Sequence, residues 1–165
     1  MKPDEITDLA RELGAALVER GWVAATAESC TGGGVGEAIT RIPGSSAWFD
    51  RGFVTYSNEA KQELLGVPAK TIADHGAVSE ETARAMVEGA LARSTATVAL
   101  SVTGIAGPDG GSAEKPVGLV WFAWGVKGRE TLSESRQLGG DREAIRAQSV
   151  AYALRGLLER VRAGS

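Results

Sequence analysis

Apolar residues recur along the chain with two different periods, which predict helices and strands in alternation. Spacings of three and four residues predict longer amphipathic helices over residues 3–19, 79–91 and 141–161. Short apolar runs predict strands at 22–27, 52–56, 97–103 and 117–126, and a more polar edge strand at 129–138. Shorter helices are expected at 35–41, after Ser45 or Ser46, and after a cap at Ser57 or Asn58. We therefore predict an α/β fold of three α/β/α layers, with a mixed sheet and a C-terminal antiparallel hairpin.

The length, composition and charge of the chain indicate a single globular domain and argue against several other classes of protein. The chain has 165 residues, which predicts one domain over residues 1–165, and 43% of them are hydrophobic. A net charge of −3 argues against a surface that coats nucleic acid. The first residues are too charged for a signal peptide, and no apolar run approaches the length of a membrane span. We expect a cytoplasmic protein with no nucleic-acid or membrane partner.

Cysteine and histidine are almost absent, which limits the chemistry available to the chain. One cysteine cannot form an internal disulfide framework, and one cysteine with one histidine cannot make a structural zinc site. His75 is the only possible imidazole base, and its surroundings (ADHG) are typical of a turn. We therefore expect no metal site.

Glycine, by contrast, is abundant and clustered. Of 22 glycines, four fall in SCTGGGVG (29–36) and four in TGIAGPDGG (103–111), each directly after a predicted strand. Ligands of open α/β sheets bind beyond the carboxyl ends of strands, so the two loops predict one shared site. Backbone N–H groups and a helix N-terminus there favour a phosphate or a developing oxyanion, although neither loop matches a known nucleotide fingerprint. Tight turns alone are the alternative explanation for these glycines.

Several side chains near these loops are candidates for nucleophile or base. Ser29 occupies the place of a nucleophile-elbow serine, but Ala27 stands where that motif has its first glycine. Cys30 is more typical of a small buried residue than of a thiolate nucleophile. Ser45 and Ser46 lie near a predicted helix start, where one of them can serve as a cap.

Lys61 is the most informative cation. The chain has five lysines against thirteen arginines, and Lys61 falls in the first turn of a predicted helix, where the dipole disfavours a positive charge. It either extends into solvent or is kept for a lowered pKa, in which case a neutral lysine could deprotonate a serine. Tyr56 ends a predicted strand, and Arg142 follows a helix cap; each suits either a site or an ordinary surface position.

Six runs together resemble one family: ATAESCTGG (25–33), GSSAWFDRGFVTYSNEAK (44–61), HGAVSEE (75–81), SVTGIAGPDGG (101–111), EKPVG (114–118) and GDR (140–142). The chain is similar to the CinA C-terminal domain of competence/damage-inducible proteins over nearly its whole length. The resemblance implies a stand-alone amidohydrolase of pyridine nucleotide salvage, which converts nicotinamide mononucleotide to nicotinate mononucleotide and ammonia. It also implies no cofactor and a homodimer or higher homo-oligomer.

The resemblance further implies roles for individual residues. It assigns Ser46 as nucleophile, Lys61 as base and Tyr56 close to the reacting group, with Ser29 and Ser45 remaining as alternative nucleophiles. Substrate binding falls to residues of the two glycine loops and the last helix: Ser29, Thr31, Gly32, Gly33, Thr103, Gly104 and Arg142. The substrate phosphate is expected on loop amides and an arginine, and its pyridinium on Trp48 or Tyr56.

Two other readings stay open at this point. A non-catalytic nucleotide-binding or regulatory domain would bind ligand without turnover. A DNA-associated factor is suggested only by the family's name, and the negative net charge counts against it.

Overall fold

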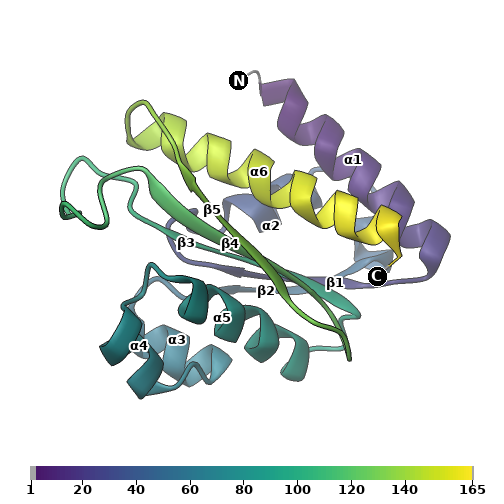
Figure 1. Cartoon of the computed structure of the whole chain (residues 1–165). Coiled ribbons are helices and arrows are strands. Elements are labelled where there is room, and N and C mark those ends of the chain that lie inside the picture. The colour runs from purple at the N-terminus through teal and green to yellow at the C-terminus, as the bar shows by residue number, and fades with distance from the viewer. Residues whose placement is uncertain (1–2, 165) are drawn as a thin grey trace.

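A five-stranded sheet separates two layers of helices in the computed structural model, which describes residues 3–164 (Figure 1). The strands are β1 (Ala24–Glu28), β2 (Phe49–Val54), β3 (Val98–Gly104), β4 (Leu119–Val126) and β5 (Leu132–Gln137). Their order is β2-β1-β3-β4-β5, with β1 parallel to both neighbours and β4 antiparallel to β3 and β5. The predicted mixed sheet, layers and C-terminal hairpin are thereby confirmed.

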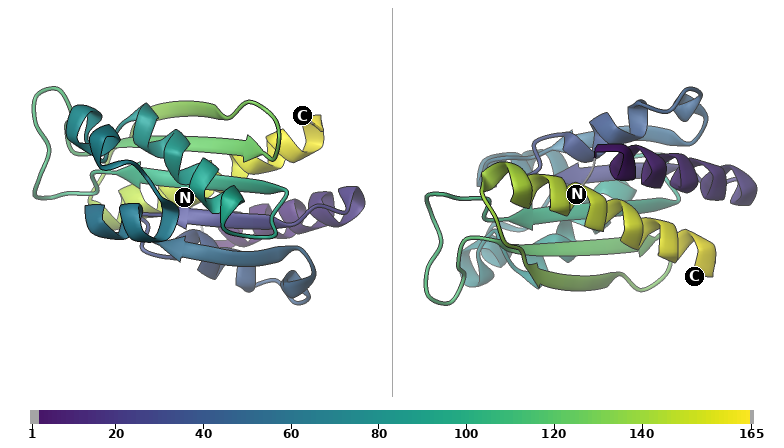
Figure 2. Two further views of the ribbon diagram at one scale, coloured as in Figure 1. Left: turned by 90° about the horizontal axis from the view of Figure 1, so that it is seen from below. Right: turned by 90° about the horizontal axis from the view of Figure 1, so that it is seen from above.

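The helices divide between the two faces of the sheet. The elements are α1 (Pro3–Arg20), α2 (Gly34–Thr40), the 3₁₀ helix η1 (Ser45–Ala47), α3 (Asn58–Leu65), α4 (Ala69–His75), α5 (Glu80–Ala92) and α6 (Arg142–Ala163). Seen from above, α1 and α6 lie side by side with α2 next to them, and from below α5 crosses the sheet beside α3 and α4 (Figure 2). The connection from β1 to β2, which contains α2, therefore lies on one face of the sheet. The connection from β2 to β3, which contains α3, α4 and α5, lies on the other.

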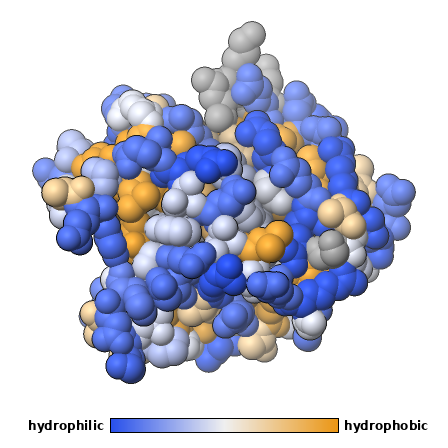
Figure 3. All heavy atoms as spheres, in the orientation of Figure 1, coloured by the Kyte–Doolittle hydropathy of each residue, from blue (hydrophilic) through white to orange (hydrophobic). Residues whose placement is uncertain are grey.

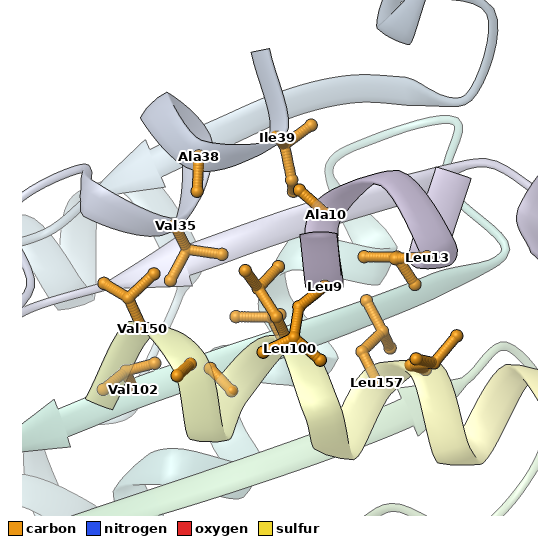
Figure 4. Packing of buried hydrophobic residues seen from close by; sticks show 14 of the residues in the cluster. Leu9, Ala10, Leu13, Val35, Ala38, Ile39, Leu100, Val102, Val150 and Leu157 are labelled. Carbon is orange, nitrogen blue, oxygen red and sulfur yellow. The ribbon is translucent and has the colours of Figure 1, made fainter. Parts of the chain in front are cut away.

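Two apolar clusters, one on each face, hold the layers together. The larger cluster joins α1, α2 and α6 to the sheet, and Figure 4 shows part of it: Leu9, Ala10, Leu13, Val35, Ala38, Ile39, Leu100, Val102, Val150 and Leu157. The smaller cluster lies under α5 and includes Met86, Val87 and Leu65. β3 contributes Val98, Leu100 and Val102 to the larger cluster and Ala99 to the smaller one, so its apolar side chains serve both faces of the sheet.

Helix starts follow the predicted caps. The side chains of Ser57, Ser79 and Asp141 accept hydrogen bonds from backbone N–H groups at the starts of α3, α5 and α6. The cap at Ser57 makes Lys61 the fourth residue of α3, at the end of its first turn. The position of the Ser57 cap thereby sets the direction in which the Lys61 side chain leaves α3.

Two local expectations differ from the structure. His75 is the last residue of α4, a helix that the pattern at 69–75 did not predict. β2 begins at Phe49, three residues before the predicted start, because Trp48 already accepts the backbone hydrogen bond of Ala24 in β1.

The outer surface offers no membrane-crossing element in the part of the chain described. No helix within residues 3–164 combines the length and the apolar character needed to span a bilayer. The face over α6 and β5 is mostly hydrophilic, with hydrophobic residues in small separate groups (Figure 3).

Candidate active site

A lysine and a serine meet at the carboxyl ends of β1 and β2. Lys61 Nζ lies 2.9 Å from Ser29 Oγ, and only 1% of the Lys61 residue is exposed. Ser29 is also buried and follows β1 directly, while its backbone N–H donates to Val102 of β3. The parallel strands therefore bring together two side chains that stand 32 positions apart in the sequence.

Two backbone carbonyls orient the Lys61 amine. Nζ lies 2.8 Å from the Thr55 oxygen and 3.3 Å from the Tyr56 oxygen. An ammonium has three N–H donors, which these two carbonyls and Ser29 Oγ can accept. When the amine is neutral, its two N–H groups can stay on the carbonyls, so that its lone pair points at Ser29. The arrangement suits a base that takes the Ser29 proton.

Burial also sets the charge state of this amine. Removal from water disfavours the ammonium and lowers the pKa of Lys61 below its ordinary value of 10.5, against a smaller opposite effect of Cys30. A base must be neutral before it can accept a proton, so the lowered pKa increases the fraction of competent enzyme near neutral pH.

The pair opens into a cavity of about 260 Å³. Eleven residues line the cavity: Ser29, Cys30, Tyr56, Asn58, Lys61, Ala77, Val78, Thr103, Gly104, Ala106 and Arg142. They include two basic side chains and no acidic one. The electrostatics of the cavity therefore favour an anionic ligand.

The structure does not bring Ser46 to Lys61, which corrects the expected pairing. Ser46 is exposed in η1, before β2, whereas Lys61 follows β2. Since β2 runs parallel to β1 from Phe49 to Val54, its six residues separate the two by roughly 17–20 Å along the sheet. Ser45 lies in the same turn of η1 and is separated in the same way. Ser29 is the serine in contact with the base.

Thr31, Gly32 and Gly33 do not line the cavity either. The start of α2 is already occupied by the Glu28 carboxylate, which accepts hydrogen bonds from the N–H groups of Val35 at 2.9 Å and Gly36 at 3.0 Å. The first glycine loop therefore presents no open helix end to a phosphate. Sequence reasoning missed Glu28, although an acidic residue at the end of a buried strand was a signal.

Tyr56 and Arg142 do meet at the mouth of the cavity. Arg142 donates to the Tyr56 hydroxyl at 3.2 Å and to the Gly107 oxygen at 2.7 Å, so it bridges the segment after β2 and the second glycine loop. The Tyr56 residue is 63% exposed, which leaves its ring accessible. Trp48 is buried before β2, with its ring against Gly14 of α1, so it is not available for stacking.

Thr103 and Gly104 form one wall of the cavity. Thr103 Oγ1 donates to the Ala77 oxygen at 2.8 Å and so ties β3 to the turn before α5. A Cβ on Gly104 would lie 2.7 Å from a Val120 methyl and 2.9 Å from the Leu119 oxygen. Gly104 is thus required by the close approach of β4, in addition to its place in the cavity wall.

Cys30 is a weak nucleophile in this setting. Burial raises the pKa of its thiol to about 11, which outweighs the opposite effect of its own backbone N–H. Nucleophilic cysteine needs thiolate, so the raised pKa disfavours a nucleophilic role for the thiol next to Ser29.

We predict that Cys30→Ala keeps the hydrolytic rate of the unaltered protein within about threefold, because the Cys30 thiol takes no part in the chemistry and the backbone is unchanged. Iodoacetamide should also leave Cys30 of the native protein unalkylated at pH 8 until the protein is unfolded in urea. Mass spectrometry measures the alkylation. Rapid native alkylation together with loss of activity in Cys30→Ala would contradict this account.

No metal-binding cluster is found in the described part of the chain. Within residues 3–164, no three His, Cys, Asp or Glu side chains gather in an arrangement that could hold an ion.

Comparisons with known proteins agree with this fold and place the chain in a family. Proteins named nicotinamide-nucleotide amidohydrolase PncC are similar over most of their length. The one from Pseudomonas putida is 58% identical over 94% of this chain and 97% of its own, and that from Enterobacter agglomerans 54% over 96% of each. A putative competence-damage inducible protein of Symbiobacterium thermophilum is 54% identical, but the match covers only 37% of its length.

Solved structures give the same result. The competence/damage inducible protein CihA from Agrobacterium tumefaciens has a TM-score of 0.93 and 48% identity, covering 96% of this chain and 97% of its own. Residues 6–161 match the family described as CinA C-terminal domain. The match spans both halves of the serine–lysine site as well as every layer of the fold, and this chain belongs to the CinA C-terminal domain family.

Proposed function

We propose that this chain is a single amidohydrolase domain that converts nicotinamide mononucleotide to nicotinate mononucleotide and ammonia, with Ser29 as nucleophile and Lys61 as base. The observation that carries the proposal is the 2.9 Å contact between Lys61 Nζ and Ser29 Oγ. The names of the relatives, at 54–58% identity over almost the whole chain, support the same substrate and reaction.

The first half of the reaction forms an acyl-enzyme. Neutral Lys61 takes the proton of the Ser29 hydroxyl while Ser29 Oγ forms a bond to the carboxamide carbon of the substrate. The resulting tetrahedral intermediate carries a negative oxygen. It collapses as the carbon–nitrogen bond breaks, and the Lys61 ammonium returns the proton to the departing nitrogen, which leaves as ammonia.

Backbone N–H groups beside Ser29 are suited to bind the negative oxygen. Within residues 3–164, the N–H groups of Cys30 and Thr31 donate to no carbonyl or side-chain oxygen. In hydrolases built on a strand–turn–helix unit, the N–H group that follows the nucleophile commonly stabilises the oxyanion. Losing one such donor typically costs about 10²–10³ in rate.

The second half releases the acid. A water molecule loses a proton to Lys61 and attacks the ester carbon, and the Ser29 oxygen leaves with the proton that Lys61 returns. Nicotinate mononucleotide is released, and Lys61 is again neutral. Both steps balance with the substrate, one water and the two side chains.

Arg142 is the proposed partner of the substrate phosphate. Its guanidinium is fixed at the cavity mouth by Gly107 and Tyr56, and the cavity lining contains no carboxylate that would compete for it. A fixed guanidinium binds phosphate oxygens through charge-assisted hydrogen bonds. The exposed ring of Tyr56 is the available surface for the pyridinium.

We expect the protein to release ammonia from nicotinamide mononucleotide. It should turn over nicotinamide riboside more slowly, because the riboside lacks the phosphate. We expect Arg142→Met to lower kcat/KM for the mononucleotide by about 10- to 100-fold, the value of a charge-assisted hydrogen bond, and to leave the riboside nearly unaffected. The measurement is a coupled ammonia assay on both substrates.

Arg155→Met is the matched control, since Arg155 is an exposed arginine of the same helix that does not line the active-site cavity. It should leave both substrates unchanged. Thermal stabilisation by the mononucleotide without any ammonia would instead support a non-catalytic nucleotide-binding domain. Equal losses on both substrates in Arg142→Met would remove the phosphate role.

A further inference from the structure

A buried carboxylate stands directly beside the proposed nucleophile without entering the cavity. Glu28 precedes Ser29, is 1% exposed, and takes no part in the chemistry described above. Its carboxylate accepts three hydrogen bonds: from Thr31 Oγ1 at 2.5 Å, Val35 N at 2.9 Å and Gly36 N at 3.0 Å. Burial of a carboxylate is costly, so a complete set of donors is required to keep it there.

These bonds close the loop of residues 29–33 onto α2. The Thr31 side chain turns back to Glu28, and Gly33 follows in the left-handed region (φ 98°) with no side chain to cap the helix. Glu28 therefore replaces the missing local cap from a position on β1. From the other side, Arg146 of α6 donates to the carbonyl oxygens of Cys30 at 3.2 Å and Thr31 at 3.3 Å. The backbone of the loop is held on both sides.

The orientation of one peptide group follows from these contacts. In a trans peptide the C=O and the following N–H point in opposite directions, so fixing the Cys30 oxygen on Arg146 turns the Thr31 N–H away from α6. That N–H is one of the two groups proposed to bind the oxyanion. The Glu28–Thr31 bond then restrains the same residue through its side chain.

Glu28 is linked to the base as well. Its backbone oxygen accepts the N–H of Thr55 at 2.8 Å, and the Thr55 oxygen in turn accepts from Lys61 Nζ at 2.8 Å. One residue is thus bonded to the segment that carries the nucleophile and to the segment that orients the base.

We propose that the Glu28 carboxylate, acting through Thr31, is a positioning residue for catalysis, which holds Ser29 and the oxyanion-binding N–H groups in the geometry of the transition state. The inference rests on the proposed function. It assigns the first glycine loop to the alignment of the nucleophile, in place of phosphate binding. Because the transition state gains from this alignment more than the bound ground state does, the effect should fall on kcat rather than on KM.

The test compares Thr31→Val, which keeps the shape but removes the hydroxyl, with Thr31→Ser, which keeps the hydroxyl. We expect Thr31→Val to lower kcat about 10- to 100-fold, the cost of a displacement of about 1 Å at the reacting centre, with KM changed less than threefold. Thr31→Ser should stay within threefold of the unaltered enzyme. Glu28→Gln should behave like Thr31→Val, since its amide would set N–H groups against the N–H donors of α2.

A second readout separates alignment from stability. An analogue of the substrate with an aldehyde in place of the carboxamide forms a tetrahedral adduct with a serine, and its affinity should fall in Thr31→Val by the same factor as kcat/KM. Affinity for the product, nicotinate mononucleotide, and the midpoint of the pH profile should not change, because Lys61 and Arg142 are untouched. Ser149→Ala, which removes a buried hydroxyl that bonds to Ile145 on α6, is the control for general destabilisation.

The outcomes distinguish this inference from the function on which it rests. If the unaltered protein releases no ammonia, the proposed function is wrong. If it turns over and Thr31→Val retains its full kcat, the positioning role is wrong and the function stands. The role is also contradicted if Thr31→Val weakens product and aldehyde binding equally, or if Ser149→Ala gives the same loss of kcat.

Discussion

Ser29→Ala is expected to abolish ammonia release from nicotinamide mononucleotide, with kcat lowered on the order of 10⁴–10⁶-fold, as for other serine nucleophiles. The reason is that no other serine hydroxyl donates to or accepts from the Lys61 amine within residues 3–164. The protein should remain folded, because Ala fits the volume of Ser and the backbone hydrogen bond from Ser29 to Val102 is kept. An ammonia assay and a circular dichroism melt check both parts.

Ser46→Ala and Ser45→Ala are the matched controls, since both residues lie in η1 before β2 begins. Each should keep kcat within about threefold of the unaltered protein, a difference worth less than 1 kcal/mol. A loss in Ser46→Ala as large as that in Ser29→Ala would contradict the assignment and return the nucleophile to the position that the family resemblance first indicated.

Lys61→Met is expected to have the second largest effect, with kcat lowered about 10²–10⁴-fold, the range for a lost general base. The change also predicts a pH dependence with a definite sign. Below its pKa Lys61 is protonated and cannot accept the Ser29 proton, so kcat/KM of the unaltered enzyme should rise with pH. The rise should level off below 10.5, because burial lowers the pKa of Lys61. Lys61→Met should lack this rise.

Two further variants test the charge and the position separately. Lys61→Arg keeps a permanent cation and should be inactive at every pH, since guanidinium is not deprotonated in this range. Lys70→Met, in which an exposed lysine of α4 is removed together with its ion pair to Asp74, should retain full activity. A pH profile in Lys61→Met identical in shape to that of the unaltered enzyme would show that the titrating base is another group.

The fold could be predicted from the sequence where periodicity and caps agree. The long helices α1, α5 and α6 have clear apolar faces, and the caps at Ser79 and Asp141 mark where two of them begin. α4 was missed because Pro68 provides no side-chain cap and none of its residues is fully buried. A short exposed helix stabilised by its surroundings leaves little trace in an apolar pattern.

The site could be predicted only in part, because the pairing of β1 with β2 decides which serine reaches Lys61. Lys61 was indicated by its rarity and its place in a first helical turn. The family resemblance assigned Ser46, but Ser46 precedes β2 and Lys61 follows it, so the whole strand lies between them. Ser29 follows β1, which runs parallel beside β2, and therefore reaches the same end of the sheet as Lys61. This arrangement is set by the pairing of β2 with β1, which joins residues 25 or 26 positions apart. Such a contact is not contained in the local pattern.

Glu28 and Arg146 were missed for a related reason. Each acts on a loop backbone from another element, Glu28 from the end of β1 and Arg146 from α6, more than 110 positions further along. A capping residue is normally sought next to the helix that it caps, whereas Glu28 lies six residues before α2 begins. These links became visible only when the layers were assembled.

The most direct test of the Ser29–Lys61 assignment is to identify the acylated residue. An aryl ester analogue of the substrate, in which acylation is fast, is mixed with enzyme, quenched in acid and digested with trypsin. Cleavage after Arg20 and Arg41 puts Ser29 in one peptide and Ser45 and Ser46 in the next. We expect the nicotinoyl nucleotide adduct on Ser29, located by fragmentation and absent from Ser29→Ala. An adduct on Ser46, Ser45 or Cys30 in the unaltered enzyme would contradict the assignment.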